Sequence, residues 1–154
     1  MAKFRSPDIA SFLSMTEMFM EERPSIEKDS SFKLDDASHI AVFQDDDGKD
    51  VALCYCDWPL AAGLGAALTM IPAAAAEDMA SDKELSDLAR DNLYEVMNMF
   101  SSLFMDNDSA HLKLVEVFPN GTKDVPAIDG DLQTATFKLD PSPYSPGLIG
   151  FISN

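Results

Sequence analysis

The first regular pattern of apolar residues lies near the N-terminus and has a helical period. Apolar residues recur every three or four positions between residues 7 and 22, which predicts an amphipathic helix. Ser6 can cap the free N–H groups of the first turn, and Pro7 suits the first helical position. Because a helix rarely continues into a proline, we expect this one to end before Pro24.

Two β-prone segments follow, at residues 38–44 and 50–57, and they flank the turn sequence Asp45–Gly48. The pattern predicts a hairpin in which Gly48 has a positive φ. The acidic turn also has a weak likeness to a calcium-binding loop. However, a loop with Gly48 at its sixth position would begin at Phe43, which is no ligand. We therefore expect a plain turn and no metal site.

The middle of the chain predicts two further helices, at about residues 58–71 and 82–105. Asp57 can cap the first, which is rich in Ala and Gly, so we expect its backbone to approach a neighbouring element closely. The segment Ser81–Glu84 has the Ser and Glu of a capping box and predicts the start of the second helix. Residues 73–76 are expected to form a connector or a short helical turn.

Three strand-like runs complete the pattern, at residues 110–118, 132–139 and 147–153, separated by turn-forming residues. The predicted order of elements is therefore α-β-β-α-α-β-β-β. Strands joined by hairpins, with helices segregated from them, indicate an α+β fold with a largely antiparallel sheet and paired helices. Since no long linker divides the chain, we expect one domain over residues 1–154.

Charge narrows the choice of partner more than the choice of fold. The chain has 154 residues, of which 27 are acidic and 11 basic, giving a formal net charge of −16. Such a surface disfavours nucleic acid and anionic membranes as partners. The uncharged residues 58–76 approach the length of a membrane span, but their prolines and acidic flanks favour a buried helix, so we expect no membrane insertion. No signal-peptide pattern follows Met1, so we expect a cytoplasmic protein.

The predicted helix at residues 82–105 carries the candidate chemistry opposite its apolar stripe. We expect seven apolar residues of this stripe to be buried: Leu85, Ala89, Leu93, Val96, Phe100, Leu103 and Phe104. On the opposite face, steps of four, three and four residues align four polar side chains toward solvent. These four residues are the polar ridge: Asp91, Glu95, Asn98 and Ser102.

Two interpretations of the polar ridge are open. A solvated acidic helix face is the common case. However, Asn is unfavourable inside a helix because its amide competes with backbone hydrogen bonds, and Asn98 lies in mid-helix three residues after Glu95. Tyr94 and Met99 border this pair. An aromatic ring and a thioether beside exposed polar groups are typical of a docking surface.

The spacing of Asp91, Glu95 and Asn98 resembles the phosphatase motif of the CheC/CheX/FliY family of chemotaxis proteins. In that motif, Asp or Ser is followed after three residues by Glu and after two more by Asn, on a surface helix. The order of elements over residues 38–118 is similar to the family too. The chain differs in having no glycine in the four residues after Asn98. The helix at residues 7–22 carries no second motif, so the resemblance is to the single-site CheX-like branch.

This resemblance implies a CheC-like fold and a CheX-like phosphatase that acts on the aspartyl phosphate of a CheY-type response regulator. Asn98 would orient the attacking water, and Glu95 would pair with the active-site lysine of the receiver domain. Four further residues would support docking: Asp91, Tyr94, Met99 and Ser102. No cofactor of the chain's own is implied, because the phosphorylated receiver holds the Mg²⁺, and dimerisation is typical of the CheX-like branch.

Two alternatives stay open from the sequence. The chain is similar in size, acidity and α+β class to chaperones of specialised bacterial secretion, although those usually end in a helix. The other alternative is a receiver-binding CheC-like module without catalysis. Further chemistry is not indicated, because Cys54 and Cys56 are expected to be buried thiols and no nucleophile motif lies near His39 or His111.

Overall fold

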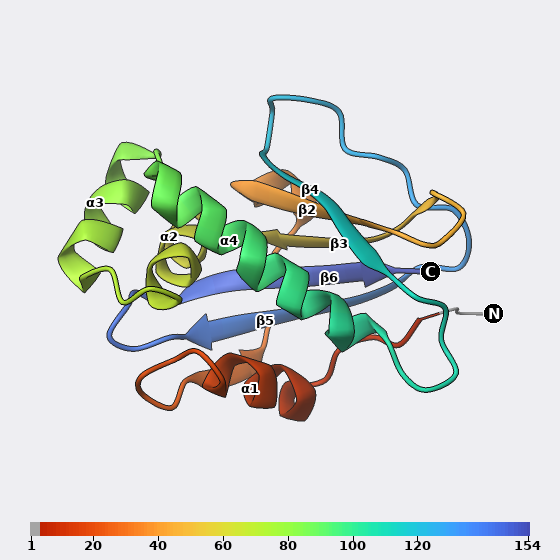
Figure 1. Ribbon diagram of the computed structural model, residues 1–154, viewed down its shortest axis with the longest axis horizontal. Coiled ribbons are helices and arrows are strands. Elements are labelled where there is room, and N and C mark those ends of the chain that lie inside the picture. Colours follow the sequence, from red (N-terminus) through yellow and green to blue (C-terminus); the bar gives the residue numbers. More distant parts are fainter. Residues whose placement is uncertain (1–3) are drawn as a thin grey trace.

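Six strands form one antiparallel sheet in the computed structural model, which describes residues 4–154 (Figure 1). Residues 1–3, part of the segment in which the sequence predicts no signal peptide, lie outside this range. The strand order across the sheet is β1-β5-β6-β3-β2-β4. The strands are β1 Ser25–Lys28, β2 His39–Gln44, β3 Asp50–Cys56, β4 Lys113–Pro119, β5 Gln133–Asp140 and β6 Gly147–Ser153.

Helices cover one face of this sheet, with α4 running diagonally across it and α1 and α2 beside it (Figure 1). None of the helices within residues 4–154 has the length and apolar character needed to cross a membrane. The helices are α1 Ile9–Glu17, α2 Trp58–Ala67, α3 Ala73–Asp82 and α4 Asp87–Phe100, with the short 3₁₀ helices η1 Leu34–Asp36 and η2 Ser101–Phe104.

The α+β class, the antiparallel sheet and the order of the predicted elements are confirmed. The turn between β2 and β3 has Gly48 at a φ of 77°, as the sequence predicts. Two short elements are added to the predicted order. Strand β1 is polar and pairs with a strand far along the chain, so no local pattern marks it. Helix α3 includes residues 73–76, which were expected to form a connector or a short helical turn, and it is longer than such a turn.

The predicted start of the long helix at Ser81–Glu84 is wrong. Ser81 lies in the last turn of α3, which ends where Lys83 adopts a left-handed conformation with a φ of 53°. The hydroxyl oxygen of Ser86 caps α4 instead, by accepting a hydrogen bond from the Ala89 N–H at 3.2 Å. The chain therefore turns between two helices, and Leu85 becomes buried within that turn.

The N-terminal helix is shorter than predicted and has a different cap. Asp8, rather than Ser6, caps α1: its carboxylate accepts from the Ser11 N–H at 2.8 Å, and the Ser11 hydroxyl accepts from the Asp8 N–H. The helix ends at Glu17, several residues before Pro24. The reciprocal Asp8–Ser11 pair satisfies two backbone donors, which explains why the helix begins there.

Phenylalanine rings fill the core between the helices and the sheet. Phe12 of α1 contacts Phe100 at the end of α4 with 5.5 Å between ring centroids, and Phe151 of β6 at 5.4 Å. Phe151 in turn meets Phe104 at 5.7 Å. All four side chains are buried, so these rings fix α1 and the end of α4 on the sheet.

The opposite face of the sheet is covered by loops and the short 3₁₀ helix η1 rather than by α-helices. Ile40, Val42 and Leu53 form a second buried cluster there, together with Tyr55. The ring of Phe32, from the loop after β1, packs on Tyr55 with 5.3 Å between centroids. Because both faces of the central strands are buried, the sequences of these strands are nearly continuous runs of apolar residues.

Asp57 fixes the start of α2 on the sheet. Its carboxylate accepts from the Leu60 N–H at 3.1 Å, which confirms the predicted cap, and from the Leu148 N–H of β6 at 3.0 Å. One side chain thus satisfies a helix terminus and a strand.

Helices α2 and α4 approach each other closely at Gly65, as the small residues of α2 predict. A Cβ atom at Gly65 would lie 2.6 Å from the backbone oxygen of Ala89, a distance that real Cβ atoms do not reach. The buried side chain of Asn92 reinforces this contact by donating to the Gly65 carbonyl at 2.9 Å and to the Thr69 hydroxyl at 2.8 Å.

We expect Gly65→Ala to lower the free energy of unfolding by about 1–3 kcal/mol, because the added methyl group must push α2 and α4 apart. Urea denaturation measures this loss. Gly63→Ala on the same helix is the control, since the nearest atom to its Cβ would be the Tyr144 Cβ at 3.3 Å and the loss should be smaller. Equal losses in the two variants would contradict the close approach.

His39 is a buried histidine that the folded chain keeps neutral. Its side chain is 4% exposed, its Nδ1 lies 2.9 Å from the Ser38 hydroxyl, and its ring meets Trp58 edge to face. Burial lowers the pKa of His39 to about 4, and the nearby charge of Arg90 adds to the decrease. In the unfolded chain the pKa of a histidine is about 6.5, so acid protonates the unfolded state first.

The free energy of unfolding should therefore fall as the pH drops from about 6.5 toward about 4. Between pH 7 and 5, we expect His39 to contribute about 2 kcal/mol to the loss of unfolding free energy. Urea denaturation of the parent chain and of His39→Gln at both pH values measures this difference. His111→Gln, at an exposed histidine, is the control and should retain the full loss. An identical pH dependence in the parent chain and His39→Gln would show that His39 does not titrate in this way.

Candidate functional site

The polar ridge lies on the outer face of α4 and continues into η2. All four of its residues are exposed: Asp91, Glu95, Asn98 and Ser102. The opposite face is buried as the helical period predicts, with each of the seven expected apolar side chains at 5% exposure or less. The structure thus brings the four ridge residues together on one surface, and the Asn92 contact with α2 fixes the rotation of the helix that carries them.

Glu95 and Asn98 lie about one helical turn apart at the centre of the ridge. Within residues 4–154, neither side chain makes a hydrogen bond or an ion pair. The Asn92 amide, on the same helix, has two partners and is buried. The amide of Asn98 and the carboxylate of Glu95 therefore remain available to an external group.

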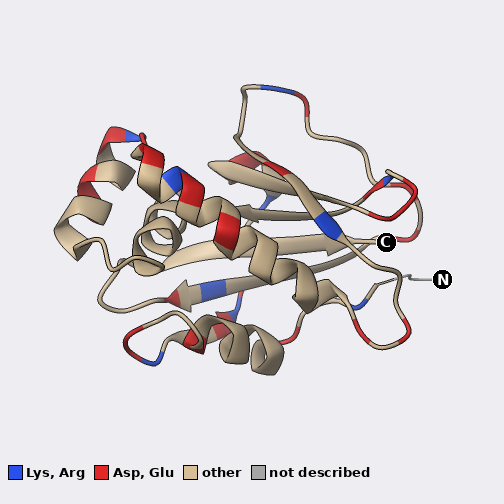
Figure 2. Ribbon diagram, in the orientation of Figure 1, with Lys and Arg blue, Asp and Glu red and all other residues tan. Residues whose placement is uncertain are grey.

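Acidic residues and one basic residue alternate with uncharged residues along the first part of α4 (Figure 2). Asp87 pairs with Arg90 at 3.3 Å, so the first acidic side chain is partly neutralised. Asp91 and Glu95 have no such pair among the residues that the structure describes. The centre of the ridge can therefore attract a cationic side chain of a partner.

The border of the ridge is partly apolar. Tyr94 is 36% exposed, and its hydroxyl lies 3.5 Å from the Leu114 carbonyl oxygen. Met99 is half-buried. The sequence analysis missed Leu88, which is 52% exposed. Its position seven residues before Glu95, on the same side of the helix, is the signal that could have placed it on this surface.

Serine side chains shape the end of the ridge, where the family pattern has a glycine. The Ser101 hydroxyl donates to the Asn98 carbonyl at 2.7 Å, and the Ser102 hydroxyl donates to the Met99 carbonyl at 2.9 Å. These bonds satisfy carbonyls at the end of α4 as the helix tightens into η2. The Ser102 oxygen can still accept a hydrogen bond from a partner.

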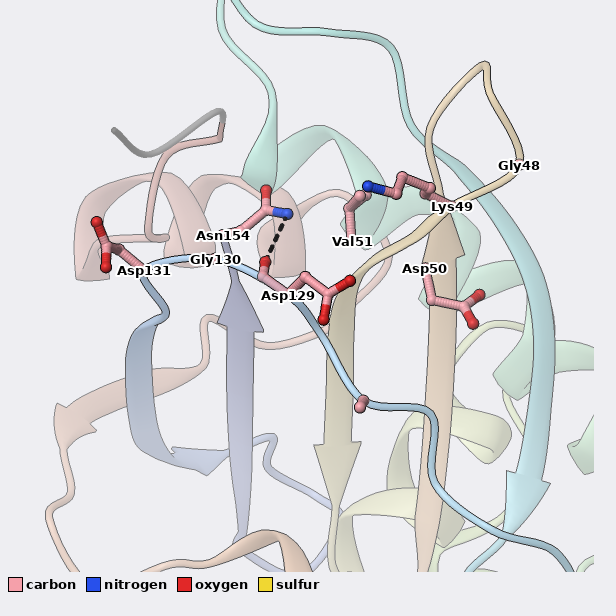
Figure 3. A pocket seen from close by; sticks show the side chains of 9 residues that line it. Gly48, Lys49, Asp50, Val51, Asp129, Gly130, Asp131 and Asn154 are labelled. Carbon is pink, nitrogen blue, oxygen red and sulfur yellow. Dashed lines mark hydrogen bonds between the residues drawn. The ribbon is translucent and has the colours of Figure 1, made fainter.

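A hollow of about 520 Å³ lies between the β2–β3 turn and the loop before β5 (Figure 3). Its lining includes Lys49, Asp50, Asp129, Asp131 and Asn154. The Asn154 amide donates to the Asp129 carbonyl at 3.2 Å, and the carboxylates of Asp129 and Asp131 point to opposite sides of Gly130 (Figure 3). Since these carboxylates do not converge on one point, the hollow is a weaker candidate site than the ridge.

The cysteines and histidines are not part of the ridge. Cys54 and Cys56 are buried on the helix side of β3, as expected, and burial raises the pKa of both thiols. His39 is buried, and His111 lies 3.5 Å from a carboxylate oxygen of Asp46. The ridge therefore offers an amide and carboxylates on a convex helix, and it can act only on a group that a partner brings to it.

The fold is that of FliY, FliM and CheX proteins, which confirms the resemblance to the CheC/CheX/FliY family at the level of the fold. FliY from Thermotoga maritima is 12% identical over 94% of this chain and 82% of its own, with a TM-score of 0.63. A chain of the FliG–FliM complex from H. pylori is 11% identical over 94% and 85%, with a TM-score of 0.63. A chain of the CheX–CheY–BeF₃–Mg²⁺ complex from Borrelia burgdorferi is 12% identical over 97% and 100%, with a TM-score of 0.57. Neither a family model nor a curated protein sequence matches the chain.

Proposed function

We propose that this chain is a CheX-like phosphatase that removes the phosphoryl group from the aspartyl phosphate of a CheY-type receiver domain. The observation that carries the proposal is the pair of exposed side chains Glu95 and Asn98, unpartnered within residues 4–154, on a helix fixed to this fold. The fold itself is shared with CheX in its complex with CheY, which supports a response regulator as the partner.

The reaction requires only one contribution from this chain, because the substrate is already activated. An aspartyl phosphate is an acyl phosphate, and the phosphorylated receiver holds the Mg²⁺ that neutralises its charge. The missing component is a water molecule held in line with the phosphorus atom. A second protein can supply this by positioning alone, without a nucleophile or a cofactor of its own.

Asn98 is suited to hold that water. A side-chain amide both donates and accepts hydrogen bonds, so it can fix the orientation of a water molecule without changing its own protonation. The structure places Asn98 in the last turn of α4, which ends at Phe100, rather than in mid-helix as predicted. Asn is still a weak helix former, and the Asn98 side chain makes no hydrogen bond that would compensate within the described part of the chain. A role toward a partner explains a residue that the helix itself does not need.

Glu95 is suited to dock the receiver. Its carboxylate lies one turn before Asn98 and has no cation of its own among residues 4–154, so it can pair with the active-site lysine of the receiver. Asp91 extends the acidic surface by a further turn, and Tyr94 and Met99 provide apolar contact area beside it. Docking through Glu95 would set the register that places Asn98 over the phosphoryl group.

The fold also bears on the alternatives. Likeness to FliY, FliM and CheX proteins over 94–97% of the chain favours the CheC-type assignment over a secretion chaperone. The receiver-binding module without catalysis uses the same ridge. It differs only in whether Asn98 accelerates the loss of phosphate, so the two are separated by a rate measurement.

We expect the chain to accelerate decay of a phosphorylated CheY-type receiver, and Asn98→Ala to reduce that acceleration on the order of a hundredfold, because the water loses its orientation. The measurement is decay of the phosphorylated receiver, across a panel of such receivers, with and without the chain. Asn107→Ala, at an exposed amide outside the ridge, is the control. Equal acceleration by the parent chain and Asn98→Ala would refute the role of Asn98. Binding of a beryllofluoride-activated receiver without acceleration would identify the non-catalytic module.

Glu95→Gln should act on docking rather than on the rate. We expect the concentration of the chain that gives half-maximal acceleration to rise about tenfold, with a smaller change in the maximal rate, since the neutral amide cannot form an ion pair with a lysine. Asp87→Asn is the control, because that carboxylate already pairs with Arg90. An equal effect of both substitutions would mean that overall charge, and not the position of Glu95, governs the encounter.

A further inference from the structure

A groove of about 440 Å³ lies between the end of α1, the end of α2 and the loop before β6. It is distinct from the polar ridge, with which it shares no residue. Two of its methionines are the most exposed large apolar residues of the described chain, Met18 at 74% and Met70 at 67%. The groove is lined mainly by Met18, Phe19, Glu21, Leu68, Met70 and Tyr144.

Met70 occupies a backbone position that favours glycine. It follows the last turn of α2 with a φ of 58°, where the N–H of Ile71 donates back to the Ala66 carbonyl at 2.9 Å. This left-handed position after a helix is usually taken by Gly, because a side chain adds strain there. The fold therefore does not need a methionine at this position, and its side chain instead extends the apolar wall of the groove.

The far wall of the groove is held in place by Tyr144. Its hydroxyl donates to the Ile71 carbonyl at 2.6 Å, which joins the loop before β6 to the segment that carries Met70. Burial raises the pKa of Tyr144, and the negative charge of Glu21 adds to the increase. The groove is thus a formed feature with a carboxylate beside its apolar floor.

The charge around the groove is mostly negative. Glu21 is the only charged residue that lines it within residues 4–154. Next to it, Arg23 is already paired with Glu17 at 3.0 Å, and Glu22 accepts a hydrogen bond from the Ser142 hydroxyl. Figure 2 shows acidic residues in the loop after α1, together with one basic position. An occupant should therefore be apolar at its centre and basic at its edges.

We propose that this groove docks a short segment of a partner protein in which apolar side chains are flanked by lysine or arginine. The apolar anchors would lie against Met18 and Met70, since methionine adapts its shape to different partners. The basic residues would face Glu21 and its acidic neighbours. A second copy of the chain fits less well, because it would bring the same acidic surface and a further net charge of −16.

The test uses a fluorescent synthetic peptide with leucines at positions i, i+4 and i+7 and lysines between them, titrated with the full chain in an anisotropy assay. A matched peptide with glutamates in place of the lysines is the control probe. We expect the lysine peptide to bind at least about tenfold more tightly than the glutamate peptide, and its binding to weaken as salt is added. Equal binding of the two peptides would overturn the proposal.

Met70→Gly separates docking from folding. It removes the exposed side chain and relieves the left-handed backbone, so we expect an unchanged or higher Tm together with at least about fivefold weaker binding of the lysine peptide. Leu132→Ser, which removes another exposed apolar side chain outside the groove, should leave binding unchanged, as should Asn98→Ala on the ridge.

Three results would contradict the proposal. Met70→Gly could bind the lysine peptide as tightly as the parent chain does. It could lower the Tm sharply, which would make Met70 a structural residue. Finally, light scattering could show a dimer that Met70→Gly converts to a monomer, in which case the occupant of the groove is a second copy.

Discussion

The backbone contact between Gly65 of α2 and Ala89 of α4 is the constraint on which the candidate site depends. Because the Ala89 oxygen occupies the space of a side chain at Gly65, the two helices meet at backbone distance. Asn92 then adds hydrogen bonds to Gly65 and Thr69 that fix the rotation of α4 about its axis. A functional pair on such a helix is held more accurately than one on a loop, which is what positioning a water molecule requires.

Local patterns were sufficient to predict which side of α4 is buried, but not where the helix begins. The apolar period depends only on neighbouring residues, so Leu93, Val96 and similar positions could be assigned from the sequence. The choice between Ser81 and Ser86 as the cap depends on the left-handed turn at Lys83, which is a tertiary outcome. Strand β1 was not predicted, because it is formed by pairing with β5, a strand far along the chain.

In the candidate site, too, some features followed from the local sequence and others depend on tertiary contacts or on a partner. The exposure of Glu95 and Asn98 followed from spacing, and the structure confirms it, whereas their roles depend on a partner and remain a proposal. Asn92 and Asn98 are the same residue type on one helix, yet only contacts with α2 show that Asn92 serves the fold. Met70 gave no signal in the sequence, because glycine is the residue that normally marks a left-handed position.

The two cysteines of the chain, Cys54 and Cys56, also determine how its surface can be studied. Both are buried, and burial raises the pKa of each thiol, so little thiolate forms in the folded protein. Thiolate is the species that reacts with maleimides. A cysteine introduced at an exposed position of α4 or beside Met70 is therefore the one thiol that a dye or spin label reaches in the native state. Binding at the ridge and at the groove can thus be followed spectroscopically, each from its own label, with both natural cysteines left in place.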